Sequence, residues 1–170
     1  HRSLALTAME IRYFGKASHA SASPWEGINA LDALQLYYAG VAALRQQLRP
    51  DVRLHGVIRE GGRAANSIPE RASCLYYARA AKRSELDKVV ARLHDVAKGA
   101  ALMTGARLEI TTPEQPMDDL VQIPALQAVL AELLTREGLG YISKEEAERR
   151  SAGSTDVGNG SHVCPTAFLE

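Results

Sequence analysis

The stretch ASCLYYARAAKRSELDKVVARLHDVAKGAALMTGARLEITT, residues 72–112, changes its hydrophobic period twice, and these changes decide the fold. Residues 72–79 alternate between apolar and polar side chains, which is typical of a half-buried strand. Residues 85–103 then carry an apolar stripe at helical spacing. Residues 107–112 alternate again, so the stretch predicts a strand, a helix and a closing strand.

The sequence before this stretch repeats the same order of elements. Residues 5–14 alternate, residues 24–48 carry a helical stripe, and residues 52–59 alternate once more. Together the two halves predict the order β-α-β-β-α-β. This is the ferredoxin-like α+β arrangement, in which two helices cover one face of an antiparallel sheet.

Local residues indicate where the two helices begin and end. Ser23 is the expected N-cap of the first helix, Pro24 suits its first position, and Glu26 would complete a capping box. Ser84 is the expected N-cap of the second helix. Gly105 is suited to the left-handed residue that follows a helix.

The character of the sequence changes after residue 112. Two prolines mark a linker, residues 123–134 predict a helix, and residues 153–166, GSTDVGNGSHVCPT, form a polar tail rich in Gly and Ser. These segments are too loop-like to form a domain alone. We therefore divide the chain into a first domain, 1–112, and a partial segment of another, 113–170.

The composition argues against partners that bind through charge. Twenty basic and twenty acidic residues leave a formal net charge of zero, so we expect neither nucleic acid nor a membrane as partner. Cys74 and Cys164 form no CxxC pair, which favours free thiols and a cytoplasmic protein. The chain begins at His1 without a methionine, and we expect it to be a fragment of a longer protein.

His19 is the first candidate functional residue. It lies in GKASHASASPWEGINAL, residues 15–31, among small Ala and Ser side chains that leave its imidazole accessible. A glycine at position 15 allows the backbone to turn sharply before it. The alternative is a surface histidine without a catalytic role, and the spacing alone does not exclude it.

Other polar residues in turns and at strand ends are weaker candidates. Asn66, in GGRAANSIPE, could present its amide to a substrate or simply belong to a hairpin turn. Arg79 could bind a carboxylate or lie on the surface. Asp156 suits an orienting carboxylate as well as an Asx-turn, and His162 has no partner at metal-site spacing.

The chain carries no motif that would hold a catalytic metal. It contains no HExxH, no HxH and no paired Cys/His cluster. A catalytic zinc needs about three protein ligands, and the residues do not supply such a set. No metal ligand is therefore assigned within these residues.

Three stretches, GKASHASASPWEGINALDA, GGRAANSIPERASCLYYARA and GSTDVGNGSHVCPT, together resemble the M20 metallopeptidase/amidohydrolase family. The likeness is greatest to its aminobenzoyl-glutamate hydrolase-like and peptidase M20 domain-containing protein 2 branch. The resemblance implies a lid, or dimerisation, domain inserted into a catalytic domain that binds two zinc ions or other divalent metals such as manganese. The metal-binding half and the last histidine ligand would lie outside this chain.

The resemblance also implies roles for the candidate residues. His19 would enter the active site of the partner subunit in a homodimer and polarise the scissile carbonyl. Asn66 would contact the substrate, and Arg79 would bind its carboxylate. Asp156 would support the loop beside the metal site. Position 160 is a glycine where relatives are expected to have a small aliphatic residue.

The implied activity is hydrolysis of an amide bond in N-acyl amino acids, dipeptides or aminobenzoyl-glutamate-like substrates, with the isolated chain inactive. One alternative is a stand-alone ferredoxin-like module that binds a ligand or a partner without catalysis. Another is a structural protein that dimerises through sheet edges.

Overall fold

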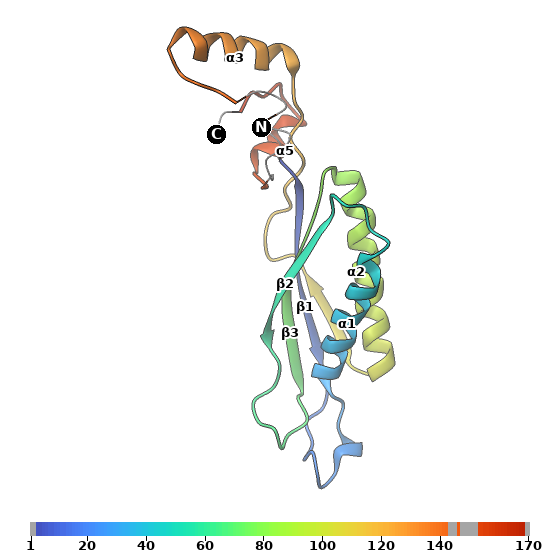
Figure 1. Ribbon diagram of the computed structural model, residues 1–170. Helices are drawn as coiled ribbons and strands as arrows, with labels where there is room; N and C mark the ends of the chain where they lie inside the picture. Colours follow the sequence, from blue (N-terminus) through green and yellow to red (C-terminus); the bar gives the residue numbers. More distant parts are fainter. Residues whose placement is uncertain (1–2, 143–145, 147–152, 169–170) are drawn as a thin grey trace.

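The computed structural model describes residues 3–142, 146 and 153–168. Four strands form one antiparallel sheet in the order β2-β3-β1-β4, and α1 and α2 lie on one face of it (Figure 1). The elements are β1 (Ala5–Phe14), η1 (Pro24–Glu26), α1 (Ala30–Arg45), β2 (Arg53–Glu60), β3 (Arg71–Ala80), α2 (Arg83–Thr104), β4 (Arg107–Thr111), α3 (Pro124–Arg136) and α5 (Val157–Ser161). The expected ferredoxin-like α+β architecture is confirmed.

The core lies between the sheet and the two helices. Met9, Ile11 and Tyr13 point from β1 toward the helices and are at most 1% exposed, as their alternation predicts. The Tyr13 hydroxyl donates to the carbonyl of Ala97 in α2 at 3.0 Å, so its polar group is satisfied in the interior. This contact joins the central strand to the longer helix.

The expected start of the first helix is wrong. Residues 24–26 form the short turn η1, and the Ser23 side chain makes no capping hydrogen bond. Ile28 instead pairs with Lys16 through two backbone hydrogen bonds, which require extended backbone at a position where the prediction had helix. The helix α1 begins at Ala30, with the side chain of Asn29 capping it, and ends at Arg45.

The second helix, in contrast, begins before its expected cap. Ser84 lies inside α2, whose cap residue is Lys82 and whose first residue is Arg83. The Asp119 carboxylate accepts a hydrogen bond from the Arg83 backbone N–H at 2.8 Å. A carboxylate 36 residues away in sequence thus takes the role expected of Ser84. The predicted C-terminal end of α2 is confirmed, because Gly105 follows the helix with a left-handed φ of 75°.

The chain enters and leaves the sheet domain side by side. Leu6 and Met117 exchange two backbone hydrogen bonds, of 2.8 and 3.0 Å, and form an isolated antiparallel bridge. Arg83 donates to both of their carbonyls, at 3.1 and 2.5 Å. These bonds tie the start of α2 to both connections.

The segments after β4 lie beyond one end of the sheet (Figure 1). No residue of α3 is buried among the described residues. The tail that was expected to be loop contains the short helix α5, whose Gly158 packs closely against the Asp118 carbonyl. No helix in the described part of the chain is long and apolar enough to cross a membrane.

Candidate functional site

The loop that carries His19 lies against the loop that carries Asn66, at the end of the sheet away from α3 and α5. His19 forms an isolated bridge with Ser67, and the Ala20 N–H donates to the Asn66 carbonyl at 3.0 Å. Both His19 and Asn66 are exposed. The fold thus brings together two residues that are 47 positions apart in the sequence.

The position of the His19 imidazole proton follows from its local hydrogen bonds. Nδ1 accepts from the backbone N–H groups of Ser21 and Ala22, both at 3.3 Å. A neutral imidazole whose Nδ1 is an acceptor carries its proton on Nε2. His19 therefore presents a hydrogen-bond donor on the side of the ring away from its own loop.

Close backbone packing explains the glycine before this loop. A Cβ at Gly15 would lie 1.9 Å from the Ile28 carbonyl oxygen, so no larger residue fits there without moving the chain. A cavity of about 440 Å³ lies beside the two loops, and its lining combines the polar residues Asn29, Arg63 and Ser67 with small or apolar residues such as Ala20. The loops are therefore packed into one defined arrangement around an accessible hollow.

Arg79 lies at the opposite end of the sheet. Its Nη1 donates to Ser154 Oγ at 2.8 Å, and its Nε donates to Nε2 of His55 at 3.4 Å. The guanidinium also lies over the Tyr77 ring, 5.9 Å from the centroid. The Tyr77 hydroxyl donates to Glu114. Arg79 is thus held against the tail loop by uncharged groups from two strands and a turn.

The remaining candidates, Asp156 and His162, flank the two ends of α5 and differ in their surroundings. Asp156 is exposed next to α5, and its side chain does not cap that helix. His162 Nε2 lies 2.8 Å from the Asp119 carbonyl oxygen. The Asp119 carboxylate is also bonded to Lys82 Nζ at 2.9 Å. His162 therefore has a structural partner in the connection to the lid.

The two groups of candidates are too far apart to act on one small molecule within a single chain. Phe14 of β1 is opposite Arg71, and Leu6 is opposite Arg79. The eight residue-to-residue steps between these two pairs span about 27 Å at ~3.4 Å per residue. A dipeptide extends only about 7 Å. His19 and Asn66 at one end, and Arg79 at the other, cannot contact the same dipeptide in one subunit.

The described residues do not form a metal site. Within residues 3–142, 146 and 153–168, no group of three or more His, Cys, Asp or Glu side chains could hold an ion. The residues described here therefore do not fit the two-metal centre that the family resemblance implies. No step of a reaction is assigned to a metal in this chain.

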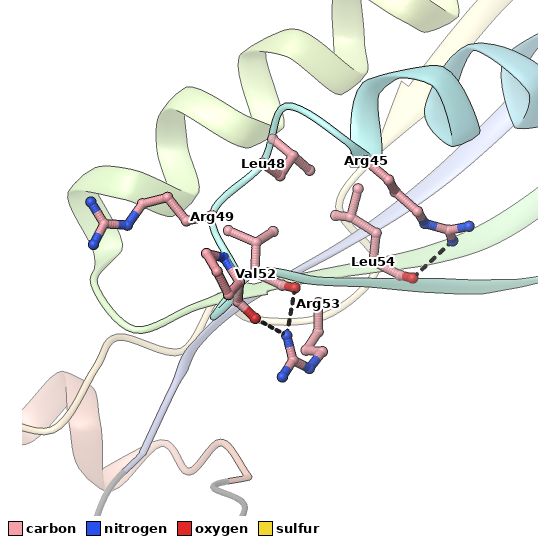
Figure 2. A pocket seen from close by; sticks show the side chains of 7 residues that line it. Arg45, Leu48, Arg49, Val52, Arg53 and Leu54 are labelled. Carbon is pink, nitrogen blue, oxygen red and sulfur yellow. Dashed lines mark hydrogen bonds between the residues drawn. The ribbon is translucent and has the colours of Figure 1, made fainter.

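A second hollow contains several arginines but lacks the geometry of an anion site. A cavity of about 330 Å³ lies at the end of α1. Figure 2 shows that Arg49 points away from Arg45 and Arg53 there. Arg45 donates to the Leu54 carbonyl at 3.0 Å, and Arg53 donates to backbone carbonyls of its own turn. Arg49 pairs with Asp51. The guanidinium groups diverge and already have partners.

Sequence reasoning missed the surroundings of Arg79. The residues that contact it come from β2, β3 and the tail, namely His55, Tyr77 and Ser154. The alternation of side chains in both strands places His55 and Arg79 on the same open face of the sheet, and this pattern in the sequence could have predicted their proximity. The contact with Ser154, 75 residues later, has no local signal.

Comparisons with known proteins agree with the sequence resemblance. A family model described as the peptidase dimerisation domain, M20_dimer, matches residues 5–103. The chain is 39% identical over 155 residues to the Xaa-Arg dipeptidase of Mus musculus, in an alignment that covers 91% of this chain and 36% of the relative. It is 34% identical over 109 residues to a p-aminobenzoyl-glutamate hydrolase subunit of Escherichia coli (strain K12), covering 64% of this chain and 23% of the relative.

A solved structure shows the same fold over most of the chain. The crystal structure of an aminobenzoyl-glutamate utilization protein from Klebsiella pneumoniae matches with a TM-score of 0.78 and 26% identity. The match covers 92% of this chain and 39% of that protein. The chain therefore spans well under half the length of the proteins to which it is similar.

Proposed function

This chain belongs to the M20 peptidase dimerisation domain family, and we propose that it forms the lid and part of the catalytic domain of a homodimeric, metal-dependent amidohydrolase. Residues 1–112 are the lid, and residues 113–170 return into the catalytic domain. The substrates are dipeptides, N-acyl amino acids or aminobenzoyl-glutamate-like amides. The names of the relatives, a dipeptidase and an aminobenzoyl-glutamate hydrolase, support this class of substrate.

The observation that carries the proposal is the separation of His19 from Arg79 along the sheet. A strand length of about 27 Å prevents one chain from placing both on a dipeptide. Two subunits related by a two-fold axis remove this restriction, because together they form two equivalent sites. Each site then contains the His19 end of one lid and the Arg79 end of the other. In the proposed dimer, His19 and Asn66 of one subunit reach the substrate that is bound by Arg79 of the other.

The edge strand β2 is the proposed contact between the two lids. It pairs only with β3 among the described strands, so its outer backbone groups are available for another strand. Val57 and Ile58 are 57% and 50% exposed on this strand. Burying these side chains and pairing the free edge would stabilise a dimer.

The residues of this chain bind and orient the substrate in the proposed reaction. The Nε2–H of His19 donates to the scissile carbonyl oxygen, where negative charge develops as the carbonyl is attacked. Asn66 supplies an additional amide contact, and Arg79 binds the carboxylate. A divalent metal, zinc or manganese, would have its ligands outside the described part of this chain, and the chemistry it would supply is activation of the attacking water.

Subunit complementation in the full-length protein tests this arrangement. His19→Ala and Arg79→Ala are each expected to abolish most hydrolysis of a dipeptide. Co-expression of the two variants with different affinity tags produces mixed dimers, each with one site that contains both native residues. We expect these purified mixed dimers to recover about half of the wild-type activity, because one of the two equivalent sites is intact.

The matched control combines His19→Ala with Asn66→Ala. These residues come from the same end of one lid, so every site in the mixed dimer lacks one of them and activity should not recover. Recovery in the control, or none in the His19/Arg79 pair, would contradict the proposal. A wild-type full-length protein that dimerises but hydrolyses none of the substrate classes would instead favour a binding module.

A further inference from the structure

We propose that His55 is a positioning residue for the substrate carboxylate, because it holds the Arg79 guanidinium in the orientation that binds the carboxylate. This inference rests on the proposed function, and it assigns a role to a residue that the sequence analysis left without one. His55 acts through Arg79 and is not itself a catalytic residue.

The register of the sheet brings the two side chains together. His55 of β2 is directly opposite Tyr77 of β3, and Arg79 is two residues further along β3. Residues in this diagonal relation lie about 7–8 Å apart at the backbone, within reach of long side chains on the same face. The Arg79 Nε–H donates to His55 Nε2 at 3.4 Å, and the His55 and Tyr77 rings meet edge to face at 5.6 Å.

The hydrogen bond requires a neutral His55. Its Nε2 accepts from Arg79, so the imidazole proton lies on Nδ1. Partial burial and the adjacent charge of Arg79 both lower the pKa of His55. The acceptor form therefore predominates at neutral pH.

Arg79 is held firmly but lacks a negative partner. Its Nε and Nη1 donate to His55 and Ser154, and its face lies over Tyr77. In the part of the chain that the structure describes, no carboxylate forms an ion pair with it, and Nη2 has no hydrogen-bond partner. The Glu114 carboxylate accepts from the Tyr77 hydroxyl. A guanidinium oriented by uncharged groups is ready to bind an anion from outside the chain.

His55 also limits how Arg79 can bind. A guanidinium engages a carboxylate through either its Nε–Nη2 edge or its Nη1–Nη2 edge. Nε already donates to His55 and Nη1 to Ser154, so each edge has one nitrogen partly occupied. The carboxylate is then directed to Nη2, the nitrogen that the two edges share.

The test compares a dipeptide with its C-terminal amide as substrates of the full-length protein. We expect His55→Ala to raise KM for the dipeptide about tenfold, the equivalent of one lost charge-assisted contact, with kcat changed less than about twofold. The amide lacks the carboxylate, so its kinetic constants should not change. His55→Gln should recover most of the dipeptide affinity, since its amide oxygen can accept from Arg79 Nε. His94→Ala, a histidine on α2 away from Arg79, is the matched control and should behave as wild type.

A second measurement on this 170-residue chain does not depend on hydrolysis. The Arg79 Nε–H signal in ¹H–¹⁵N NMR spectra should exchange with water several-fold faster in His55→Ala, but not in His94→Ala. An unchanged signal would overturn the inference, as would an equal rise in KM for the dipeptide and its amide. If the wild-type protein hydrolyses no dipeptide, the proposed function fails. The exchange rates then still decide whether His55 orients Arg79.

Discussion

Replacing Arg83 with alanine should destabilise the connection between the lid and the segments that follow it. The Arg83 side chain is 22% exposed and donates to Asp118 Oδ1 at 2.6 Å, to Thr7 Oγ1 at 2.9 Å, and to the carbonyls of Leu6 and Met117. Its loss leaves a partly buried carboxylate without its cation and two carbonyls short of a donor.

The expected cost follows from these contacts. A hydrogen bond with a charged group contributes about 1.5–3 kcal/mol to stability. The total for Arg83 is smaller than the sum of its bonds, because bonds that share one guanidinium are not additive and this guanidinium is partly solvated. We therefore expect Arg83→Ala to lower the free energy of unfolding by about 3 kcal/mol. For a chain of this size the melting temperature should fall by roughly 6–12 °C.

Chemical and thermal unfolding of the 170-residue chain, followed by circular dichroism, measure this effect. Arg92→Ala is the matched control, since Arg92 is exposed on the same helix, and it should change stability by less than about 0.5 kcal/mol. Arg83→Lys should lower the free energy of unfolding by less than Arg83→Ala does, because one ammonium can reach some but not all four of these acceptors. Faster hydrogen exchange at the Leu6 and Met117 amides should accompany the Arg83→Ala change. The reasoning is refuted if Arg83→Ala and Arg92→Ala are equally stable.

Two further predictions concern other parts of the fold. Gly15→Ala should lower the free energy of unfolding, measured by thermal unfolding, by about 1–3 kcal/mol, because the new Cβ would lie 1.9 Å from the Ile28 carbonyl oxygen. Gly99→Ala, in open space on α2, should instead be neutral or stabilising by up to about 1 kcal/mol, and the same loss in both variants would contradict the steric argument. Burial raises the pKa of Cys74 to about 12, whereas Cys164 is exposed. A thiol reagent at pH 8 should therefore label Cys164 rapidly and Cys74 only after denaturation; rapid labelling of both in the native protein would count against a buried Cys74.

Much of the architecture could be predicted from hydrophobic period alone. Alternation placed Met9, Ile11 and Tyr13 on the covered face of β1, and the helical stripe identified the buried face of α2. Gly105 ended that helix as predicted, because only glycine adopts a left-handed conformation there at little cost. These features depend on interactions between residues close in the sequence and on which side chains are removed from water, so they can be predicted from the sequence.

The helix starts were mispredicted because distant residues compete with local caps. Ser23 and Ser84 have the right chemistry for capping, but Ile28 pairs with Lys16 and the Asp119 carboxylate binds the first N–H of α2. Local propensity is a weak preference that tertiary hydrogen bonds override.

The sequence by itself determined the order of strands and helices, the face that each buries, and the motifs that resemble the M20 family. Only the tertiary structure decided how the candidate residues are grouped. It joined His19 to Asn66, and it brought His55 and Ser154 to Arg79 at the other end of the sheet. The physical reason is that strand register and chain crossing create these contacts between residues far apart in sequence, whereas periodicity records only which side of an element faces the core.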